Sequence, residues 1–210
     1  MQKLQVEPCG FLRLFLFFWK KVIFMTLNEF KDSLEQFPVI ATVHASELSK
    51  ALKSPAEILV HMKADLLTIK EDIEAVHGAG KYILVHIDLA DGIASDKTGI
   101  QFLANLGVDG IISTRGKLIR QAKDMGLITV QRFFALDSQG IESIEEMLSV
   151  CSPDFIEIIP GVIGKVISRF ASRGIPVIAG GLIESKAEIT EALSSGASAV
   201  STGKEDLWYV

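Results

Sequence analysis

From Pro38 to the C-terminus, short apolar runs alternate with longer amphipathic stretches. Each run is rich in valine and isoleucine, and about 10 to 15 residues with charges on one face follow it, ending at a glycine-containing turn. The runs predict eight strands: Val39–Val43, Ile58–His61, Tyr82–Asp88, Gly110–Ser113, Ile128–Phe133, Phe155–Ile159, Pro176–Ala179 and Ala199–Thr202. The stretches between them predict helices: Glu47–Leu52, Asp65–His77, Lys97–Leu106, Lys117–Met125, Ile141–Cys151, Gly164–Ser172 and Lys186–Ser194.

This alternation predicts an α/β fold, namely a compact TIM-type (β/α)8 barrel with parallel strands. Strands that alternate with helices are joined by right-handed crossovers, and near-continuous apolar strands such as Ile83–Val85 are buried on both faces. An open doubly wound sheet is the alternative, but no Gly-x-Gly-x-x-Gly follows the first predicted strand. A length of 210 residues suits one domain, which we place at residues 25–210.

The N-terminal segment differs from the rest of the chain. An apolar run, Phe11–Trp19, precedes Lys20 and Lys21. The run is too short for a transmembrane helix, and its flanks lack the features of a signal peptide. Met25 opens a more ordinary segment. We therefore expect translation to begin at Met25 and residues 1–24 to be a non-native or disordered extension.

Composition and charge narrow the class of protein further. The two cysteines, Cys9 and Cys151, lie in no metal-binding motif, which indicates reduced thiols in a cytoplasmic protein and no metal site. The net charge is −5, and residues 1–24 contribute +3 of it, which leaves −8 for the remainder. An acidic chain is not a general nucleic-acid binder, so any RNA contact requires a local basic patch.

The ends of the last two predicted strands carry the most specific signal for a ligand. Gly180 and Gly181 let backbone N–H groups approach an anion closely, and Ser201, Thr202 and Gly203 add hydroxyl and amide donors. TIM barrels often hold phosphate at these two strand ends. We therefore predict a phosphate site there, with tight turns that need glycine as the alternative.

Charged residues near other strand ends are candidates for binding a polyol. His86 and Asp88 would share one face of a strand, as an acid–base couple or as ligands of hydroxyl groups. Asp88 as the cap of a turn is the alternative. Glu157 stands between isoleucines and needs a partner, which Arg132 on the adjacent strand would supply. That pair is either structural or part of a site.

The remaining candidate chemistry is weak. The sequence has no Gly-x-Ser-x-Gly and no His-Glu-x-x-His, and Lys63 is the nearest approach to a Schiff-base lysine. A basic stripe, Arg115, Lys117, Arg120 and Lys123, lies on or beside a predicted helix. Such a stripe is usually a solvated surface, and an RNA-binding patch is the alternative.

Several short motifs follow one another in order between Pro38 and Trp208. They are His86-Ile-Asp-Leu89 with Gly92, Asp109–Thr114, Gln131–Phe134 with Leu136–Ser138, Pro153-Asp154, Glu157–Gly161, Ile175–Ile183, Glu191–Leu193 with Gly196-Ala197, and Ser201-Thr202 with Leu207-Trp208. With these motifs the sequence resembles the bacterial glycerol-3-phosphate-responsive antiterminators. The resemblance implies a TIM-barrel regulator that is not an enzyme, needs no cofactor and takes glycerol 3-phosphate as its effector. It further implies action on the leader mRNA of glycerol-metabolism genes, which prevents transcription termination and stabilises the transcript.

Three residues depart from the usual pattern of that family. Gly164 replaces a proline, Gly203 replaces a serine at the phosphate loop, and His44 stands where a basic residue is common. We expect Gly203 to alter affinity without abolishing binding, because its amide still donates.

We expect glycerol 3-phosphate and leader mRNA as partners, no membrane association and a location in the cytoplasm, and a homo-oligomer is compatible with the sequence. Two alternatives remain. One is a small phosphate-metabolite isomerase or aldolase with Asp88 or Glu157 as base. The other is a barrel that has kept the phosphate site and lost regulation.

Overall fold

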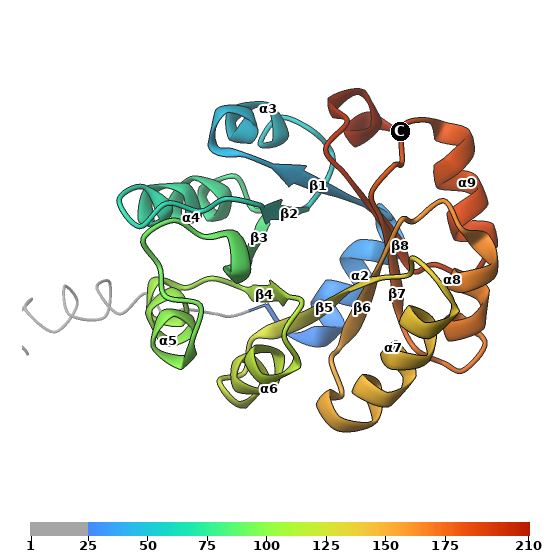
Figure 1. The fold of residues 1–210 in the computed structure, drawn as a ribbon. Coiled ribbons are helices and arrows are strands. Elements are labelled where there is room, and N and C mark those ends of the chain that lie inside the picture. The colour runs from blue at the N-terminus through green and yellow to red at the C-terminus, as the bar shows by residue number, and fades with distance from the viewer. Residues whose placement is uncertain (1–24) are drawn as a thin grey trace, which may run out of the picture.

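The computed structural model describes residues 25–210, so the prediction for residues 1–24 lies outside the described residues. Eight parallel strands close into a barrel in the order β1-β2-β3-β4-β5-β6-β7-β8, with β8 pairing back onto β1. Helices surround the ring of strands (Figure 1). The predicted TIM-type (β/α)8 barrel is confirmed.

The strands are β1 (Val39–Val43), β2 (Ile58–His61), β3 (Tyr82–His86), β4 (Gly110–Ser113), β5 (Ile128–Phe134), β6 (Phe155–Ile159), β7 (Val177–Gly180) and β8 (Ala199–Thr202). The helices are α2 (Leu27–Gln36), α3 (Leu48–Ala51), α4 (Ile69–Gly78), α5 (Lys97–Leu106), α6 (Gly116–Asp124), α7 (Ser138–Cys151), α8 (Gly164–Ala171) and α9 (Lys186–Ser194). Short 3-10 helices are η1 (Ala45–Glu47), η2 (Ile87–Leu89) and η3 (Glu205–Tyr209). The predicted extension of β3 to Asp88 is wrong, because the chain turns into η2 directly after His86.

Helix α2, which the strand–helix alternation did not predict, packs against the N-terminal end of the barrel. A capping box fixes its first turn: Thr26 Oγ1 accepts from the Glu29 amide, and the Glu29 carboxylate accepts from the Thr26 amide at 2.7 Å. Phe30 and Leu34 lie one turn apart on the buried face, and the Phe30 ring lies 5.0 Å from that of Phe155. The helix therefore covers the barrel interior at the N-terminal ends of the strands.

Side chains alternate along each strand between the barrel interior and the surrounding helices. The interior is apolar through most of its height, with Ile40, Val60, Leu84, Val130 and Ile178 among its residues. One inward position further along, the strands carry Thr42, Met62, His86, Arg132, Glu157, Gly180 and Ser201. The apolar core thus gives way to a largely polar layer at the C-terminal mouth, the end at which TIM barrels place their sites.

Candidate functional site

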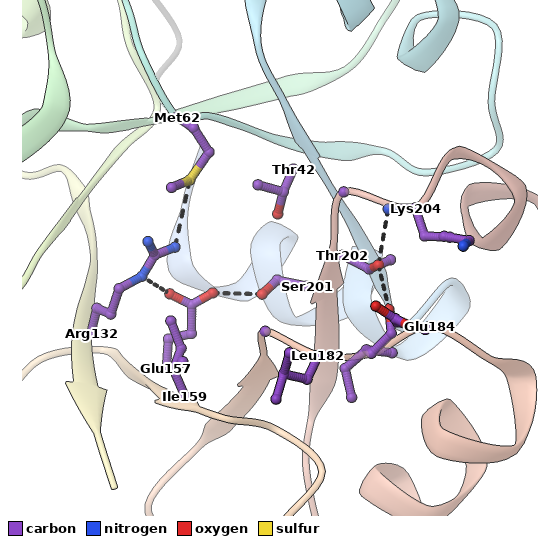
Figure 2. A pocket seen from close by; sticks show the side chains of 13 residues that line it. Thr42, Met62, Arg132, Glu157, Ile159, Leu182, Glu184, Ser201, Thr202 and Lys204 are labelled. Atoms are coloured by element: carbon purple, nitrogen blue, oxygen red, sulfur yellow. Dashed lines mark hydrogen bonds and ion pairs between the residues drawn. The ribbon is translucent and has the colours of Figure 1, made fainter. Parts of the chain in front are cut away.

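A cavity of about 360 Å³ opens at the C-terminal mouth, where strands β5 to β8 end and β1 and β2 border it. Figure 2 shows the side chains that line it. The lining includes these residues predicted from the sequence: Arg132, Glu157, Gly181, Ser201, Thr202 and Gly203. Predicted residues from four strands therefore meet at one cavity, and Gly180 lies beside its floor.

A chain of polar contacts crosses the floor of the cavity (Figure 2). Arg132 Nε donates to Glu157 Oε2 at 2.5 Å, and Ser201 Oγ donates to Glu157 Oε1 at 2.5 Å. All three residues are buried, and Glu157 is only 2% exposed. A buried charge needs a partner, and the predicted Arg132–Glu157 pair is confirmed. Because both residues also line the cavity, the pair can stabilise the fold and contact a ligand at the same time.

The end of β7 is built for close backbone approach. Gly161 donates its amide to the Gly180 carbonyl at 2.6 Å, and a Cβ on Gly161 would lie 2.6 Å from the Gly180 nitrogen. Gly181 and Leu182 follow with φ of 70° and 58°, in the left-handed region. Within residues 25–210 the Gly181 amide forms no hydrogen bond outside the strand pairing, and Gly181 lines the cavity. It is thus free to donate to a ligand.

The end of β8 is fixed by its threonine. Thr202 Oγ1 donates to the Ile183 carbonyl at 2.9 Å and accepts from the Lys204 amide at 3.1 Å, while Trp208 Nε1 donates to the Thr202 carbonyl at 2.8 Å. The Thr202 hydroxyl therefore holds the β7 and β8 ends together. Its proton is donated to the Ile183 carbonyl, so it is not available to a ligand.

Gly203 follows at the cavity wall. Its amide has no partner among the described residues. A Cβ there would meet the Thr42 carbonyl at 3.6 Å, an ordinary contact, so the backbone does not require glycine at this position.

Other lining residues were missed by the sequence analysis. They are Thr42, Met62, Ile159, Leu182, Ile183, Glu184 and Lys204. Thr42 and Ile159 occupy inward positions at strand ends, and Met62 lies just beyond β2, so the two-residue period of the strands was a usable signal for them. Glu184 and Lys204 lie on loops whose path no periodicity gives.

His86 points into the barrel interior beside this cavity. Burial lowers its pKa, the Arg132 charge lowers it further, and the Asp88 and Glu157 carboxylates oppose both. His86 is 3% exposed, and its Nδ1 has no hydrogen-bond partner in the described structure. The imidazole is therefore neutral at neutral pH, with one ring nitrogen unsatisfied.

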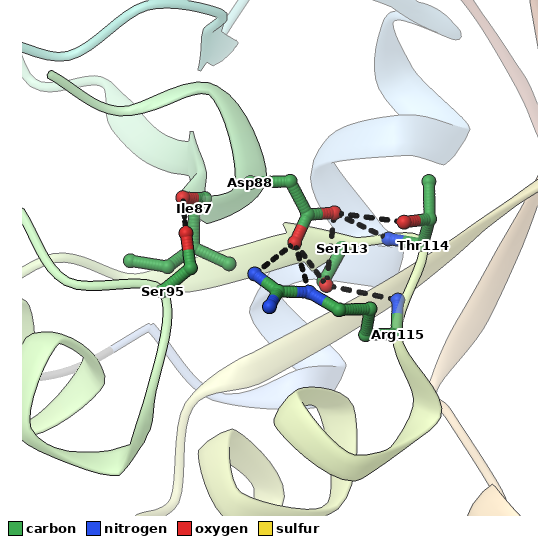
Figure 3. A network of polar contacts seen from close by, with 6 residues as sticks. All are labelled: Ile87, Asp88, Ser95, Ser113, Thr114 and Arg115. Atoms are coloured by element: carbon green, nitrogen blue, oxygen red, sulfur yellow. Dashed lines mark hydrogen bonds and ion pairs between the residues drawn. The ribbon is translucent and has the colours of Figure 1, made fainter.

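Asp88 lies apart from the cavity, contrary to the prediction that it shares a strand face with His86. Its carboxylate accepts hydrogen bonds from Ser113 Oγ at 2.9 Å, from the Thr114 amide at 2.7 Å and from Arg115 Nε at 2.9 Å (Figure 3). Burial raises the pKa of Asp88, but these hydrogen bonds outweigh burial and lower it overall. Asp88 thus anchors the loop between β4 and α6.

The predicted basic stripe is divided by its contacts. Arg115 pairs with Asp88 at 2.8 Å. Lys123 Nζ donates to the Ser152 carbonyl at 2.6 Å and lies 3.0 Å from an Asp154 carboxylate oxygen. Lys117 and Arg120 are exposed, and neither forms an ion pair within residues 25–210.

Two kinds of feature are absent from residues 25–210. These residues contain no group of three or more His, Cys, Asp or Glu side chains placed to hold a metal ion. None of their helices has the length and apolar character needed to cross a membrane. Lys63 is exposed and pairs with Asp91 at 3.0 Å, so it does not face the barrel interior.

The fold and the cavity define a TIM barrel with a polar cavity at its C-terminal mouth, and comparison with known proteins identifies the family. The family described as glycerol-3-phosphate responsive antiterminator matches residues 39–208. The glycerol uptake operon antiterminator regulatory protein from Listeria monocytogenes is 33% identical, with a TM-score of 0.78 over 82% of this chain and 95% of that chain. The chain therefore belongs to the glycerol-3-phosphate responsive antiterminator family.

Two further relatives agree with this assignment. A glycerol uptake operon antiterminator-related protein from Thermotoga maritima is 31% identical, with a TM-score of 0.74, over 81% of this chain and 96% of that chain. The uncharacterized protein YgcP of Escherichia coli is 33% identical over 83% of this chain and 93% of its own length. More distant structures, such as the deoxyribose phosphate aldolase from Aeropyrum pernix at 14% identity and a TM-score of 0.63, share the fold alone.

Proposed function

We propose that the protein senses glycerol 3-phosphate in the cavity at the ends of β7 and β8. The phosphate would accept hydrogen bonds from the Gly181 and Gly203 amides, which have no partner among the described residues. The glycerol hydroxyls would contact Arg132 and Glu157 on the cavity floor, with His86 beside them. Gly180 and Ser201 shape that floor, and Thr202 holds the two strand ends together.

One observation carries this proposal. Free backbone donors and a carboxylate–guanidinium pair line a single cavity in a member of a family described as glycerol-3-phosphate responsive. The pair offers both acceptors and donors, which suits the hydroxyl groups of a polyol, whereas the amides suit an anion. The hydroxyl protons of Ser201 and Thr202 are already donated within the protein. These side chains would therefore position the site and bind phosphate only by exchanging a partner.

The regulatory output is a contact with RNA. Ligand binding would favour a conformation that binds the leader mRNA of glycerol-metabolism genes, prevents termination and stabilises the transcript in the cytoplasm. A ligand shifts such an equilibrium only by its differential affinity for the two states. Arg115, Lys117, Arg120 and Lys123 are the cations proposed from the sequence for this contact, and those without internal partners, Lys117 and Arg120, suit it best.

Titration of a leader RNA with and without glycerol 3-phosphate tests this function. We expect tighter binding, with a strong salt dependence, when the ligand is present. Equal affinity in both conditions would exclude gating by the ligand. No RNA affinity at any salt concentration, with ligand binding intact, would favour a barrel that has lost regulation.

An enzyme of small phosphorylated metabolites is the second candidate, because aldolases share the fold. The structure offers it little support. The Asp88 carboxylate already accepts hydrogen bonds from the β4–α6 loop, and Lys63 forms an ion pair with Asp91. Of the two bases suggested by the sequence for such an enzyme, Asp88 and Glu157, only Glu157 lines the cavity. Turnover of a triose or sugar phosphate that Glu157→Gln abolishes would establish this alternative, and we expect no turnover.

A further inference from the structure

A second groove runs between α5 and α6, apart from the barrel cavity. It consists of a hollow of about 300 Å³ that residues of both helices line and an adjoining hollow of about 390 Å³ that only α5 lines, and the two share Lys97 and Thr98. The residues that line them are Ser95, Asp96, Lys97, Thr98, Gln101, Phe102, Asn105, Arg115, Lys117, Leu118 and Gln121. The proposed effector site uses none of these residues.

The groove is basic on an acidic molecule. Lys97 and Lys117 are exposed, and neither pairs with a carboxylate in the described part of the chain. Asp96 is the one acidic residue of the lining. Its carboxylate accepts hydrogen bonds from the Thr98 and Gly99 amides at 2.8 and 3.0 Å and so caps the N-terminus of α5. Because residues 25–210 carry a formal charge of −8, these free lysines mark a surface suited to a polyanion.

The uncharged residues of the groove suit bases. Gln101 Nε2 donates to Asn105 Oδ1 at 3.0 Å, which leaves one amide hydrogen of Gln101 and both amide hydrogens of Asn105 available. Gln121 Oε1 is buried in the wall and has no hydrogen-bond partner in the described structure. Phe102 is half-buried and presents part of its ring. Unpaired RNA bases are recognised by amide hydrogen bonds and by stacking on aromatic rings.

The geometry points to the α5–α6 groove as the contact site for a single-stranded RNA segment, an inference that rests on the proposed function. Phosphates lie against Lys97 and Lys117, and bases meet Phe102 and the amides. Arg115 and Lys117 belong to the predicted basic stripe, whereas Lys97 comes from a different helix. A protein partner fits less well, because Phe102 and Leu118 are the only apolar residues of the lining.

The groove is also joined to the barrel interior. Arg115, on its wall, is held by Asp88 of η2, and η2 begins directly after His86 (Figure 3). His86 is close enough to Arg132 for the guanidinium charge to lower its pKa. One short segment therefore connects the effector cavity with the RNA groove.

The test compares the double variant Lys97→Ala/Lys117→Ala with the control Lys31→Ala/Lys53→Ala. The control removes two exposed lysines that also lack ion pairs in residues 25–210, so both variants change the net charge equally. A labelled leader RNA is titrated at several salt concentrations with saturating glycerol 3-phosphate. The melting temperature with the same ligand reports the effector site independently.

We expect the groove variant to bind RNA about tenfold or more weakly and to lose about 1.4 from the slope of log affinity against log salt, as for two single-strand phosphate contacts. The control should stay within about twofold of the wild type, and all proteins should show the same ligand-induced melting shift. Equal loss in both variants, or no loss in either, would overturn the groove assignment while the wild type still binds RNA.

If the wild type binds no leader RNA, the proposed function itself fails. If the groove variant keeps RNA affinity but loses antitermination in a reconstituted transcription reaction, the groove takes a protein, and the RNA assignment is wrong.

Discussion

Ser201 on β8 donates a hydrogen bond to Glu157 on β6 across an intervening strand, with 2.5 Å between Oγ and Oε1. The contact exists because β7 carries Gly180 between them. A Cβ on Gly180 would lie 2.6 Å from Glu157 Oε1 and 2.7 Å from Ser201 Oγ. This glycine therefore serves side-chain packing on the cavity floor, whereas the amides that we propose as anion donors belong to Gly181 and Gly203.

Substitution of Gly180 by alanine should separate these two side chains. We expect a loss of about 1–3 kcal/mol in the free energy of unfolding, from overpacking of a buried position, together with weaker binding of glycerol 3-phosphate. Urea denaturation and calorimetric titration measure the two effects. Gly78→Ala is the matched control, because no atom other than those of its neighbouring residues and helix backbone lies within 4 Å of its added Cβ, and it should not destabilise the protein. A neutral Gly180→Ala would show that the Ser201–Glu157 contact contributes little.

Removal of Arg132 should be more damaging than removal of both charges. Arg132→Met leaves the Glu157 carboxylate buried without its cation, which we expect to cost about 3–5 kcal/mol. Arg132→Met/Glu157→Gln removes the uncompensated charge and should recover much of that loss. A double-mutant cycle by chemical denaturation gives the coupling energy. Additive effects would contradict an energetically important pair.

Stability should fall on the acid side through His86. Burial, followed by the Arg132 charge, lowers the folded-state pKa of His86 below its ordinary value of 6.5. The unfolded state therefore binds more protons, so this contribution is fully present above about pH 6.5 and is lost as the pH falls through the folded pKa. His86→Gln should weaken that dependence. Unchanged pH dependence in denaturation between pH 7 and 5 would contradict the assignment.

Asp88 should stabilise the β4–α6 loop only while it is ionised. Because its folded-state pKa is lowered, the contribution is present above about pH 4 and disappears as the pH falls through the folded value. Asp88→Asn directs an amide donor at the donors of Ser113, Thr114 and Arg115, so we expect a loss of about 1–3 kcal/mol at pH 7. Denaturation from pH 7 to 3 should show this difference shrinking. Asp124→Asn on the exposed side of α6 is the control and should be neutral at every pH.

The barrel was predictable because its strands and helices are signalled locally. Valine- and isoleucine-rich runs gave five of the eight strands with their observed bounds, including Gly110–Ser113 and Ala199–Thr202. The error at Asp88 has a physical cause: the strand ends where backbone pairing ends, and side-chain polarity does not report that point. Helix α2 was readable from its capping box and apolar pair, but it stands outside the repeating pattern.

The position of the cavity was predictable from the sequence, but most of the contacts that line it were not. The last two strand ends follow from the fold, and the Arg132–Glu157 pair follows from strand adjacency. The contact between Ser201 and Glu157 depends on closure of the barrel around Gly180, which no local pattern shows. The α5–α6 groove likewise arises from two helices whose charges are unremarkable when taken separately.

We propose above all that the cavity at the ends of β7 and β8 binds glycerol 3-phosphate. The most direct measurement is the melting temperature against a panel of phosphorylated metabolites, because a ligand that binds the folded state raises it by mass action. We predict a rise of about 5–10 °C at glycerol 3-phosphate concentrations near 100 times Kd, with smaller shifts for glycerol, inorganic phosphate and sugar phosphates. No rise with glycerol 3-phosphate, or a larger rise with a different phosphate ester, would contradict it.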